Sequence, residues 1–197
     1  MSPRRIARGI SDRIATNVFR TTRGVRVGDA FRLRGSPIVS LAPNSSFLAG
    51  DRVLIISDRR ETALGVFHPT IIRTLLPGAK IIIGSDTGMS GGVICAAHDV
   101  EIGERCLIGA NVSIFDTDFH PVAQIPRRYL GVESTTPKPV VIEDDVFLGT
   151  GCIITKGVTI GRGSVIGAGS VVSRDIPSFV IAAGNPCTVI RSISGAV

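Results

Sequence analysis

The stretch FDTDFHPV, at residues 115–122, gathers residue types that can move protons. It holds His120, one of only three histidines in the chain, with Asp116 and Asp118 just before it and Pro121 just after. An imidazole can accept a proton and return it near neutral pH, so His120 is a candidate general base. The same residues would also suit an ordinary surface turn. The elements on either side must therefore show whether the histidine is held for chemistry.

The chain around this stretch repeats every six residues. From Ile142 to Pro177 it divides into IEDDVF, LGTGCI, ITKGVT, IGRGSV, IGAGSV and VSRDIP, and every piece opens with Ile, Leu or Val. The fifth residue of each piece is small or medium-sized, and Gly often stands second. Upstream, IGSDTG, MSGGVI, IGERCL and IGANVS follow the same pattern, interrupted by one extra residue between Cys95 and Glu101. A repeat of this length predicts a β-helix rather than a two-layer sandwich, which needs no six-residue spacing.

The predicted fold is therefore all-β, a parallel β-helix in which three short strands form one triangular coil of about 18 residues. The first residue of each six is expected to point into the core and to stack on its counterpart in the next coil, about 4.8 Å away. Small fifth residues fit the narrow interior near a corner. Glycine at the second position suits a tight turn, where either a side chain would collide or φ must be positive.

The places where the six-residue repeat is lost mark the boundaries between the segments of the chain. We expect a short helical or irregular N-terminal arm over residues 1–30 and a single β-helix domain over residues 31–197. Residues 121–139 contain four prolines and no sixfold frame, so they are expected to form an external loop of the kind that carries function. Residues 178–197 also abandon the repeat and are expected to cap the open end.

Basic residues gather at the N-terminal end of a chain whose formal net charge is +6. The first 34 residues hold two aspartates, Asp12 and Asp29, and nine arginines: Arg4, Arg5, Arg8, Arg13, Arg20, Arg23, Arg26, Arg32 and Arg34. Nucleic-acid binding is disfavoured because these arginines are not interleaved with a pattern of stacking aromatics. Ile6, Ile10 and Ile14 recur at helical spacing, so a solvated helix with an apolar stripe is expected. The remaining interpretation of these arginines is at most a weak contact with an anionic membrane surface.

The bulk composition limits the class of protein. Hydrophobic residues make up 44% of the chain and the mean hydropathy is +0.36, yet no apolar run approaches the roughly 20 residues of a membrane span. No uninterrupted apolar segment of a secretory signal stands at the N-terminus. The four cysteines lack the CxxC spacing of metal sites. A reduced, cytoplasmic protein is the expectation.

Three segments carry a family resemblance: DTDFHP before the loop, KPVVIEDDVFLGTGCIITKGVTIGRGSVIGAGSVVSRDIP after it, and the tail AAGNPCTVIR. From about Ile83 to Arg191 the chain resembles the hexapeptide-repeat acyltransferases, most closely the maltose/galactoside type of sugar O-acetyltransferase. The resemblance implies a left-handed β-helix, a homotrimer with active sites between subunits, acetyl-CoA as acyl donor and no metal. It also implies a small-molecule or glycan acceptor, such as a surface-polysaccharide or lipopolysaccharide precursor.

The same resemblance assigns roles to residues. His120 matches the family's catalytic histidine, which takes the proton of the attacking hydroxyl, while Asp116 or Asp118 would fix the ring or hold the acceptor. Ser90 lies near the position where the sugar enzymes usually carry an acceptor-binding Asn, so this departure leaves the acceptor open. The residues that match cofactor contacts are Thr150, Ala168, Ser173, Arg174, Asn185 and Arg191. Two further departures are Phe147 in place of the usual Trp and Thr188 in place of a frequent Arg.

Other interpretations compete with this one. His98, in the frame-breaking insertion, is expected to be solvated, and His68 to be structural. A zinc site of three histidines, as in a carbonic-anhydrase branch of the same fold, is disfavoured because His98 and His120 are too far apart in sequence. N-acetylation of an amino sugar, or acetylation of an antibiotic, would use the same scaffold. A β-helix that only assembles or binds is the non-enzymatic alternative.

Overall fold

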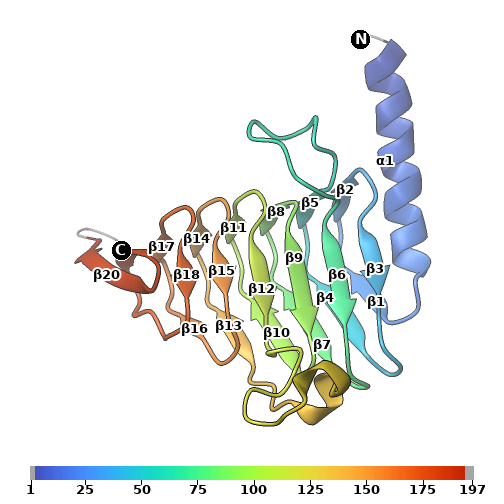
Figure 1. Ribbon diagram of the computed structural model, residues 1–197. Helices are drawn as coiled ribbons and strands as arrows, with labels where there is room; N and C mark the ends of the chain where they lie inside the picture. The colour runs from blue at the N-terminus through green and yellow to red at the C-terminus, as the bar shows by residue number, and fades with distance from the viewer. Residues whose placement is uncertain (1–2, 194–197) are drawn as a thin grey trace.

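The chain winds into a three-sided coil, seen in a computed structural model that describes residues 3–193, with side chains from Gly9 onward (Figure 1). One helix, α1 (Pro3–Thr21), stands at the N-terminal end of the coils. Sheet A contains β1 (Val25–Val27), β4 (Ser46–Ala49), β7 (Lys80–Ile83), β10 (Asp99–Ile102), β13 (Val140–Ile142) and β16 (Thr159–Ile160). Sheet B contains β2 (Arg32–Arg34), β5 (Leu54–Ile56), β8 (Gly88–Ser90), β11 (Leu107–Ile108), β14 (Phe147–Leu148), β17 (Val165–Ile166), β19 (Val180–Gly184) and β20 (Cys187–Ser192). Sheet C contains β3 (Ile38–Ser40), β6 (Ile71–Thr74), β9 (Val93–Ala96), β12 (Ser113–Phe115), β15 (Ile153–Ile154) and β18 (Val171–Val172).

From β1 to β18 the strands follow the order A, B, C along the chain, and each pairs in parallel with the strand of the same sheet one coil away. Ile114, for example, aligns with Ile94 of the previous coil and Ile154 of the next. This arrangement confirms the predicted parallel β-helix. Each coil has three corners, which we call the A–B, B–C and C–A corners after the sheets that they join.

The core is a stack of the first residues of the sixes. Six of them are fully buried: Ile142, Leu148, Ile154, Ile160, Ile166 and Val172. The fifth residues are buried beside them at the corners, and Cys106 and Cys152 are two of these. All four cysteines are buried and free, so they serve as packing residues of the interior. Burial raises the pKa of the Cys95 thiol to about 11.

Glycines of the repeat fall into two physical classes. At the second position, a Cβ on Gly149 would lie 2.6 Å from the backbone nitrogen of Ala168 in the next coil. At the fourth position, Gly151 has φ of +69°, while Asn111 and Asp145 adopt positive φ at equivalent corners. Second-position glycines therefore permit close stacking of coils, and fourth-position residues supply the left-handed turn.

Aromatic and polar contacts join α1 to the first coils. Phe19 stacks on Phe31, with ring centroids 5.5 Å apart, and meets Phe47 edge-on at 5.3 Å. The carboxylate of Asp12 accepts a hydrogen bond from the backbone N–H of Gly35. The helical arm is thus confirmed, but strand β1 already pairs with β4, so the first coil begins before the predicted boundary at residue 31. Residues 1–2, which belong to the predicted arm, and the Ile6 side chain lie outside the described part.

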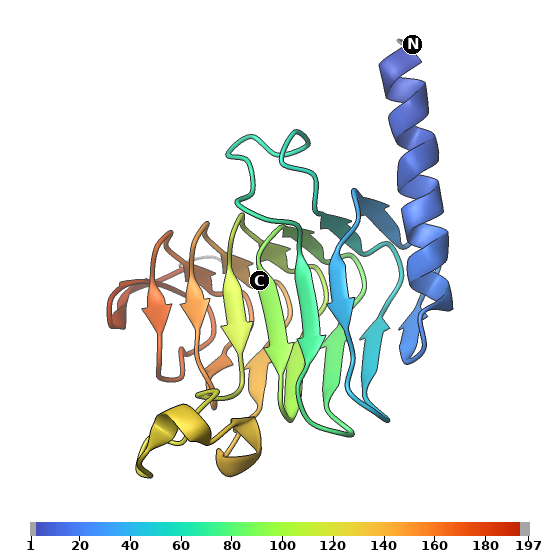
Figure 2. The same ribbon diagram turned by 45° about the vertical axis from the view of Figure 1, so that its right-hand side comes forward.

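The other end of the stack is closed by a hairpin. Strand β19 joins sheet B in parallel with β17, and β20 turns back antiparallel to it. Figure 2 shows this hairpin at the end of the coils farthest from α1. The predicted cap is therefore present as a two-stranded closure, and its last residues, 194–197, lie outside the described residues.

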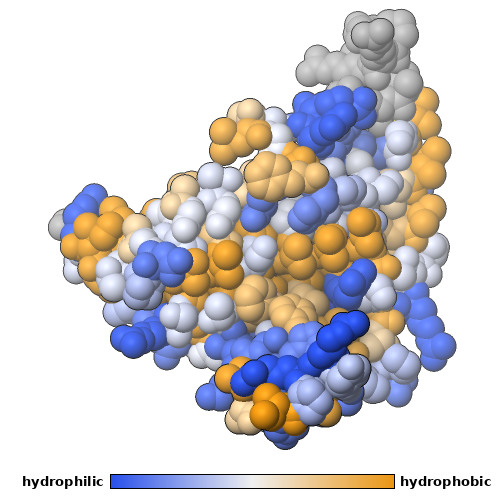
Figure 3. Space-filling view, viewed as in Figure 1, coloured by the Kyte–Doolittle hydropathy of each residue, from blue (hydrophilic) through white to orange (hydrophobic). Residues whose placement is uncertain are grey.

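The outward face of sheet C carries an apolar row across the coils (Figure 3). The strand register aligns Ile38, Ile71, Val93, Ile153 and Val171 in this row, and Ser113 interrupts it between Val93 and Ile153. Ile38 and Ile153 are 44% and 37% exposed in the isolated chain. Contiguous apolar surface of this kind is common at protein contact faces.

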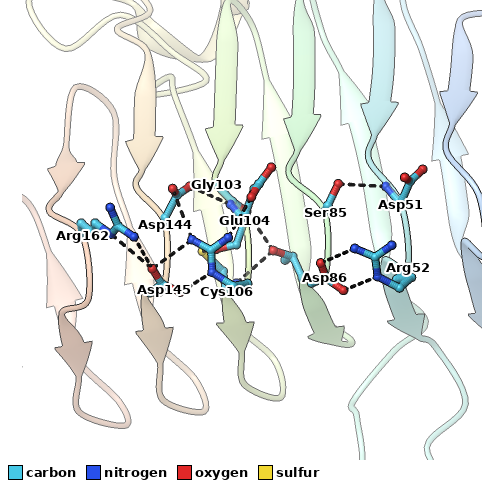
Figure 4. A network of polar contacts seen from close by, with 12 residues as sticks. Asp51, Arg52, Ser85, Asp86, Gly103, Glu104, Cys106, Asp144, Asp145 and Arg162 are labelled. Carbon is cyan, nitrogen blue, oxygen red and sulfur yellow. Dashed lines mark hydrogen bonds and ion pairs between the residues drawn. The ribbon is translucent and has the colours of Figure 1, made fainter. Parts of the chain in front are cut away.

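Charged side chains form a ladder along the A–B corner (Figure 4). Arg52 pairs with Asp86, while Arg105 and Arg162 both bond the carboxylate of Asp145. The hydrogen bond from Arg105 is the main cause that lowers the pKa of Asp145. These pairs are largely exposed, so each contributes little to stability, and their effect is to order the turns that join sheets A and B.

Candidate active site

His120 lies where the chain leaves the regular coil after β12. The backbone N–H of His120 donates to the carbonyl of Asp118 at 2.7 Å, and Phe119 between them has φ of +64°. This is a γ-turn, a rare conformation for a bulky residue. Such turns occur at functional sites, where the surrounding contacts hold them in place. Here the ring of Phe119 packs on Phe115 at 5.4 Å, which holds the turn against the end of the strand.

The imidazole of His120 is held by the loop itself. Its Nδ1 lies 2.7 Å from the backbone carbonyl oxygen of Leu130. Because a carbonyl only accepts hydrogen bonds, Nδ1 carries the proton and Nε2 is left as the basic nitrogen. The ring is exposed. The tautomer is thus fixed by a backbone group rather than by either of the aspartates considered from the sequence.

Asp116 has a structural role. Its side chain is fully buried, and its two oxygens accept 2.7 Å hydrogen bonds from the backbone N–H groups of Ala97 and His98. Burial raises the pKa of Asp116, against the opposing effect of these bonds. The predicted contact between Asp116 and the acceptor is therefore wrong, because both oxygens are engaged inside the coil, where they brace the frame-breaking insertion.

Asp118 is held by a residue that the sequence analysis missed. The ammonium group of Lys156 donates to the Asp118 carboxylate, and it lies 3.3 Å from the carbonyl oxygen of Thr136. Lys156 stands at the C–A corner one coil further on, so it ties both limbs of the loop to the body. The signal was available in the repeat, because the sixfold frame places the third residue of ITKGVT beside the point where the loop departs.

Replacing Lys156 by Met should lower kcat about tenfold while leaving the melting temperature nearly unchanged. The loss of the charge frees Asp118, and with it the turn that presents His120, whereas a partly exposed pair contributes little to folding. Steady-state kinetics and thermal unfolding measure the two effects. Lys80→Met, at an exposed lysine on β7, is the matched control and should match the parent protein. Equal kcat values for the two variants would show that Lys156 does not position the turn.

The loop is an insertion into one corner. The backbone N–H of Lys138 donates to the carbonyl of Asp116, so the two ends meet. Between them run two short 3₁₀ turns, Arg127–Tyr129 and Val132–Ser134, the first of which supplies exposed side chains. The external loop predicted at residues 121–139 is present, and it departs a few residues earlier.

Three predicted ligand contacts share the B–C corner. Ser90 ends β8 there, and Thr150 and Ala168 follow β14 and β17 in later coils. The N–H of Gly169 donates to the carbonyl of Thr150, and this hydrogen bond stacks the turn after β17 on the turn after β14. The Thr150 hydroxyl donates to the carbonyl of Ala110 at 2.7 Å. These residues therefore form one edge of the molecule, with Ala168 exposed.

The other predicted cofactor contacts lie toward the C-terminal end. Ser173 and Arg174 are exposed at the C–A corner after β18, Asn185 is in the turn of the terminal hairpin, and Arg191 is on β20. Ser173 and Arg174 thus share a corner with His120, two coils further along.

Sheet C separates His120 from Thr150 and Ala168 within one chain. These two precede the strands of sheet C, and His120 follows one, so about 10 Å of strand lies between the two edges. A single chain does not bring the predicted base and this part of the predicted cofactor site together. No group of three or more His, Cys, Asp or Glu side chains that could hold a metal occurs in the described part of the chain.

Comparisons with known proteins agree with this fold. The family described as "Hexapeptide repeat of succinyl-transferase" matches residues 99–115 and 139–174. Galactoside O-acetyltransferase of Lactococcus lactis subsp. lactis is 47% identical over 96 residues, which are 49% of this chain and 44% of that protein. A 2,3,4,5-tetrahydropyridine-2,6-dicarboxylate N-acetyltransferase of Halalkalibacterium halodurans is 34% identical over 150 residues, 72% of this chain and 62% of that protein.

A solved structure gives the same result. A hexapeptide-repeat-containing acetyltransferase from Vibrio cholerae O1 biovar eltor, complexed with acetyl-CoA, is 33% identical with a TM-score of 0.54, over 62% of this chain and 65% of that one. The chain carries the hexapeptide repeat and is similar to acetyltransferases built from it, and its coils are the left-handed β-helix predicted from the sequence. It spans about half the length of several curated relatives that it matches.

Proposed function

We propose that the protein transfers an acetyl group from acetyl-CoA to a carbohydrate hydroxyl, with His120 as the general base. The observation that carries the proposal is the contact between Nδ1 of His120 and the Leu130 carbonyl, which leaves Nε2 of an exposed residue to take a proton. A hydroxyl is a poor nucleophile unless its proton is removed as it attacks. Galactoside O-acetyltransferase among the relatives supports the same class of reaction.

His120 can both remove the proton of the acceptor and return it to the leaving group. Nε2 of His120 takes the proton of the acceptor hydroxyl while the oxygen attacks the acetyl carbonyl. The resulting imidazolium is stabilised by its bond to the Leu130 carbonyl. It then returns the proton to the departing thiolate, so the ring ends neutral, as it began. Backbone N–H groups are the simplest donors for the oxyanion that forms between these steps.

The B–C corner fits the slender arm of acetyl-CoA, which supplies an activated acyl thioester. Cβ atoms placed on Gly151 and Gly169 would meet nothing within 4 Å, so this edge is open and smooth beside Thr150 and Ala168. The Vibrio cholerae relative was crystallised with acetyl-CoA, which supports the same ligand here. A long, thin ligand could lie along the coils toward the terminal hairpin that carries Asn185 and Arg191.

Binding of CoA should raise the melting temperature. A ligand at a hundredfold excess over its Kd stabilises a protein by about 2.7 kcal/mol, which for a chain of this size corresponds to roughly 5–10 °C. Thermal unfolding with millimolar CoA measures this shift. Ala168→Tyr should abolish it by filling the exposed corner, whereas Ser36→Tyr, at the same edge in the first coil, should not. No shift in the parent protein would favour the non-enzymatic scaffold.

Acceptor choice separates the remaining candidates. The N-acetyltransferase relative favours an amine acceptor as the second candidate, either an amino sugar or an antibiotic. A screen of hydroxyl and amine acceptors with acetyl-CoA, read by release of free thiol, distinguishes the two. Ser90, half-buried at the B–C corner, and Asp118, paired with Lys156, stay predicted acceptor contacts.

We also propose that the chain works in the cytoplasm as a homotrimer with its active sites between copies. The apolar row on sheet C supports this, because a neighbour would cover it. So does the separation of His120 from Thr150 and Ala168, which a neighbouring copy would remove by placing its B–C corner against the loop. Light scattering on the purified protein tests the assembly.

A further inference from the structure

Helix α1 exposes an apolar stripe to solvent. Ile10, Ile14 and Val18 recur at every fourth position and are 55%, 59% and 63% exposed. The buried residues Asp12 and Phe19 lie on the opposite side of the helix, against the first coils. At about 100° per residue, Ile10 points away from the body of the protein, while Ile14 and Val18 form the outer side of a groove whose far side is Pro37 and Val39 of the first coil. Three aligned β-branched side chains facing water are unusual unless something covers them.

The rest of α1 and the first coil are strongly basic, and Arg13 and Arg32 line a groove on the flank of the helix opposite Ile14 and Val18. Exposed arginines on α1 and in the first coil are Arg13, Arg20, Arg23, Arg26 and Arg32. Of the two acidic residues in the first 34, Asp12 is buried and bonded to Gly35 and Arg34, while Asp29 is exposed, so the exposed arginines outnumber the exposed carboxylates. A second copy of this surface would meet like charge, whereas an anionic surface would complement it.

The position of the helix leaves the stripe accessible. α1 stands at the outer end of the coil stack and extends beyond the sheets, with orange along its outer edge in the space-filling view (Figures 1 and 3). No helix in residues 3–193 is long and apolar enough to cross a membrane.

We propose that α1 docks the protein on an anionic phospholipid surface. Ile10, Ile14 and Val18 enter the boundary between headgroups and acyl chains, and the neighbouring arginines pair with lipid phosphates. A helix that combines a narrow apolar stripe with an arginine-rich polar side has the composition of an interfacial helix. Phosphatidylglycerol and related lipids supply the matching charge. The inference is independent of the acetyl-transfer chemistry.

Sedimentation of the full chain with lipid vesicles tests the proposal. The protein should pellet with vesicles that contain phosphatidylglycerol and stay in solution with phosphatidylcholine alone. Binding should weaken as salt is raised, because the arginine–phosphate attraction is screened. The double variant Ile10→Asp, Ile14→Asp should bind at least tenfold more weakly, since both changes place a carboxylate in the apolar boundary. Leu64→Asp is the matched control, at a residue 72% exposed on another loop, and should bind like the parent protein.

Three outcomes would overturn the proposal. The first is failure of the parent protein to pellet with anionic vesicles. The second is equal binding by the double variant and the parent protein, which would leave only non-specific charge attraction. The third is a change of assembly mass in the double variant, measured by light scattering, together with no vesicle binding by the parent protein. That result would assign the stripe to a contact between copies. Circular dichroism and acetyl transfer to a soluble acceptor should be unchanged in the double variant, which separates loss of docking from loss of fold or activity.

Discussion

Replacing His120 by Ala should lower kcat by roughly a hundredfold or more, with little change in KM for acetyl-CoA. General base catalysis contributes about that factor, and no other imidazole lies in the same loop to replace it. The side chain is exposed, so its removal should leave the fold intact. Release of free CoA thiol in the presence of a working acceptor measures the rate.

The matched control is His98→Ala. His98 is also exposed near the C–A corner, but its ring pairs with Asp99 rather than with the loop. The control should keep the parent rate, and light scattering should give one assembly mass for all three proteins. If His120→Ala turned over as fast as His98→Ala, the proposed base would be wrong. If it lost activity together with its assembly, the effect would be structural.

The repeat made the core predictable because a β-helix translates sequence spacing directly into position. Each residue contacts its counterparts one coil away, so Ile114 meets Ile94 and Ile154 without any long-range search. The periodic Ile, Leu and Val residues therefore identified the buried stack. The irregular first coils were less predictable: β1 escaped detection because its three residues carry no sixfold frame.

The candidate site was only partly predictable, because its contacts depend on how an insertion folds. The partner of His120 is the carbonyl of Leu130, and every residue has a carbonyl, so no residue type marks it. Asp116 looked like a candidate by its nearness to His120 in sequence. The structure instead turns it inward, toward Ala97 and His98. The residue type alone identified His120 as a candidate base, whereas the fold of the insertion determines which groups contact its ring.

Gly149→Ala should destabilise the protein by roughly 2–3 kcal/mol, because the added methyl group meets backbone rather than a movable side chain. Its Cβ would lie 2.6 Å from the nitrogen and 2.8 Å from the Cα of Ala168. The next coil cannot yield easily, since Gly149 itself donates a 2.8 Å hydrogen bond to Ile166 in that coil. Relief would require stretching the parallel ladder on which the β-helix depends.

Gly88→Ala provides the comparison with the same chemical change. A Cβ on Gly88 would meet nothing within 4 Å, and its φ is outside the left-handed region. It should therefore be neutral or stabilising by up to about 1 kcal/mol. Thermal unfolding at one protein concentration should place Gly149→Ala roughly 4–12 °C below the parent protein and Gly88→Ala at or above it. Equal melting temperatures would mean that the corner is soft and that these glycines do not set the coil spacing. If Gly149→Ala lowered both the melting temperature and its increase on CoA binding, the B–C corner would also be part of the cofactor site, because Thr150 and Ala168 lie beside the added methyl group.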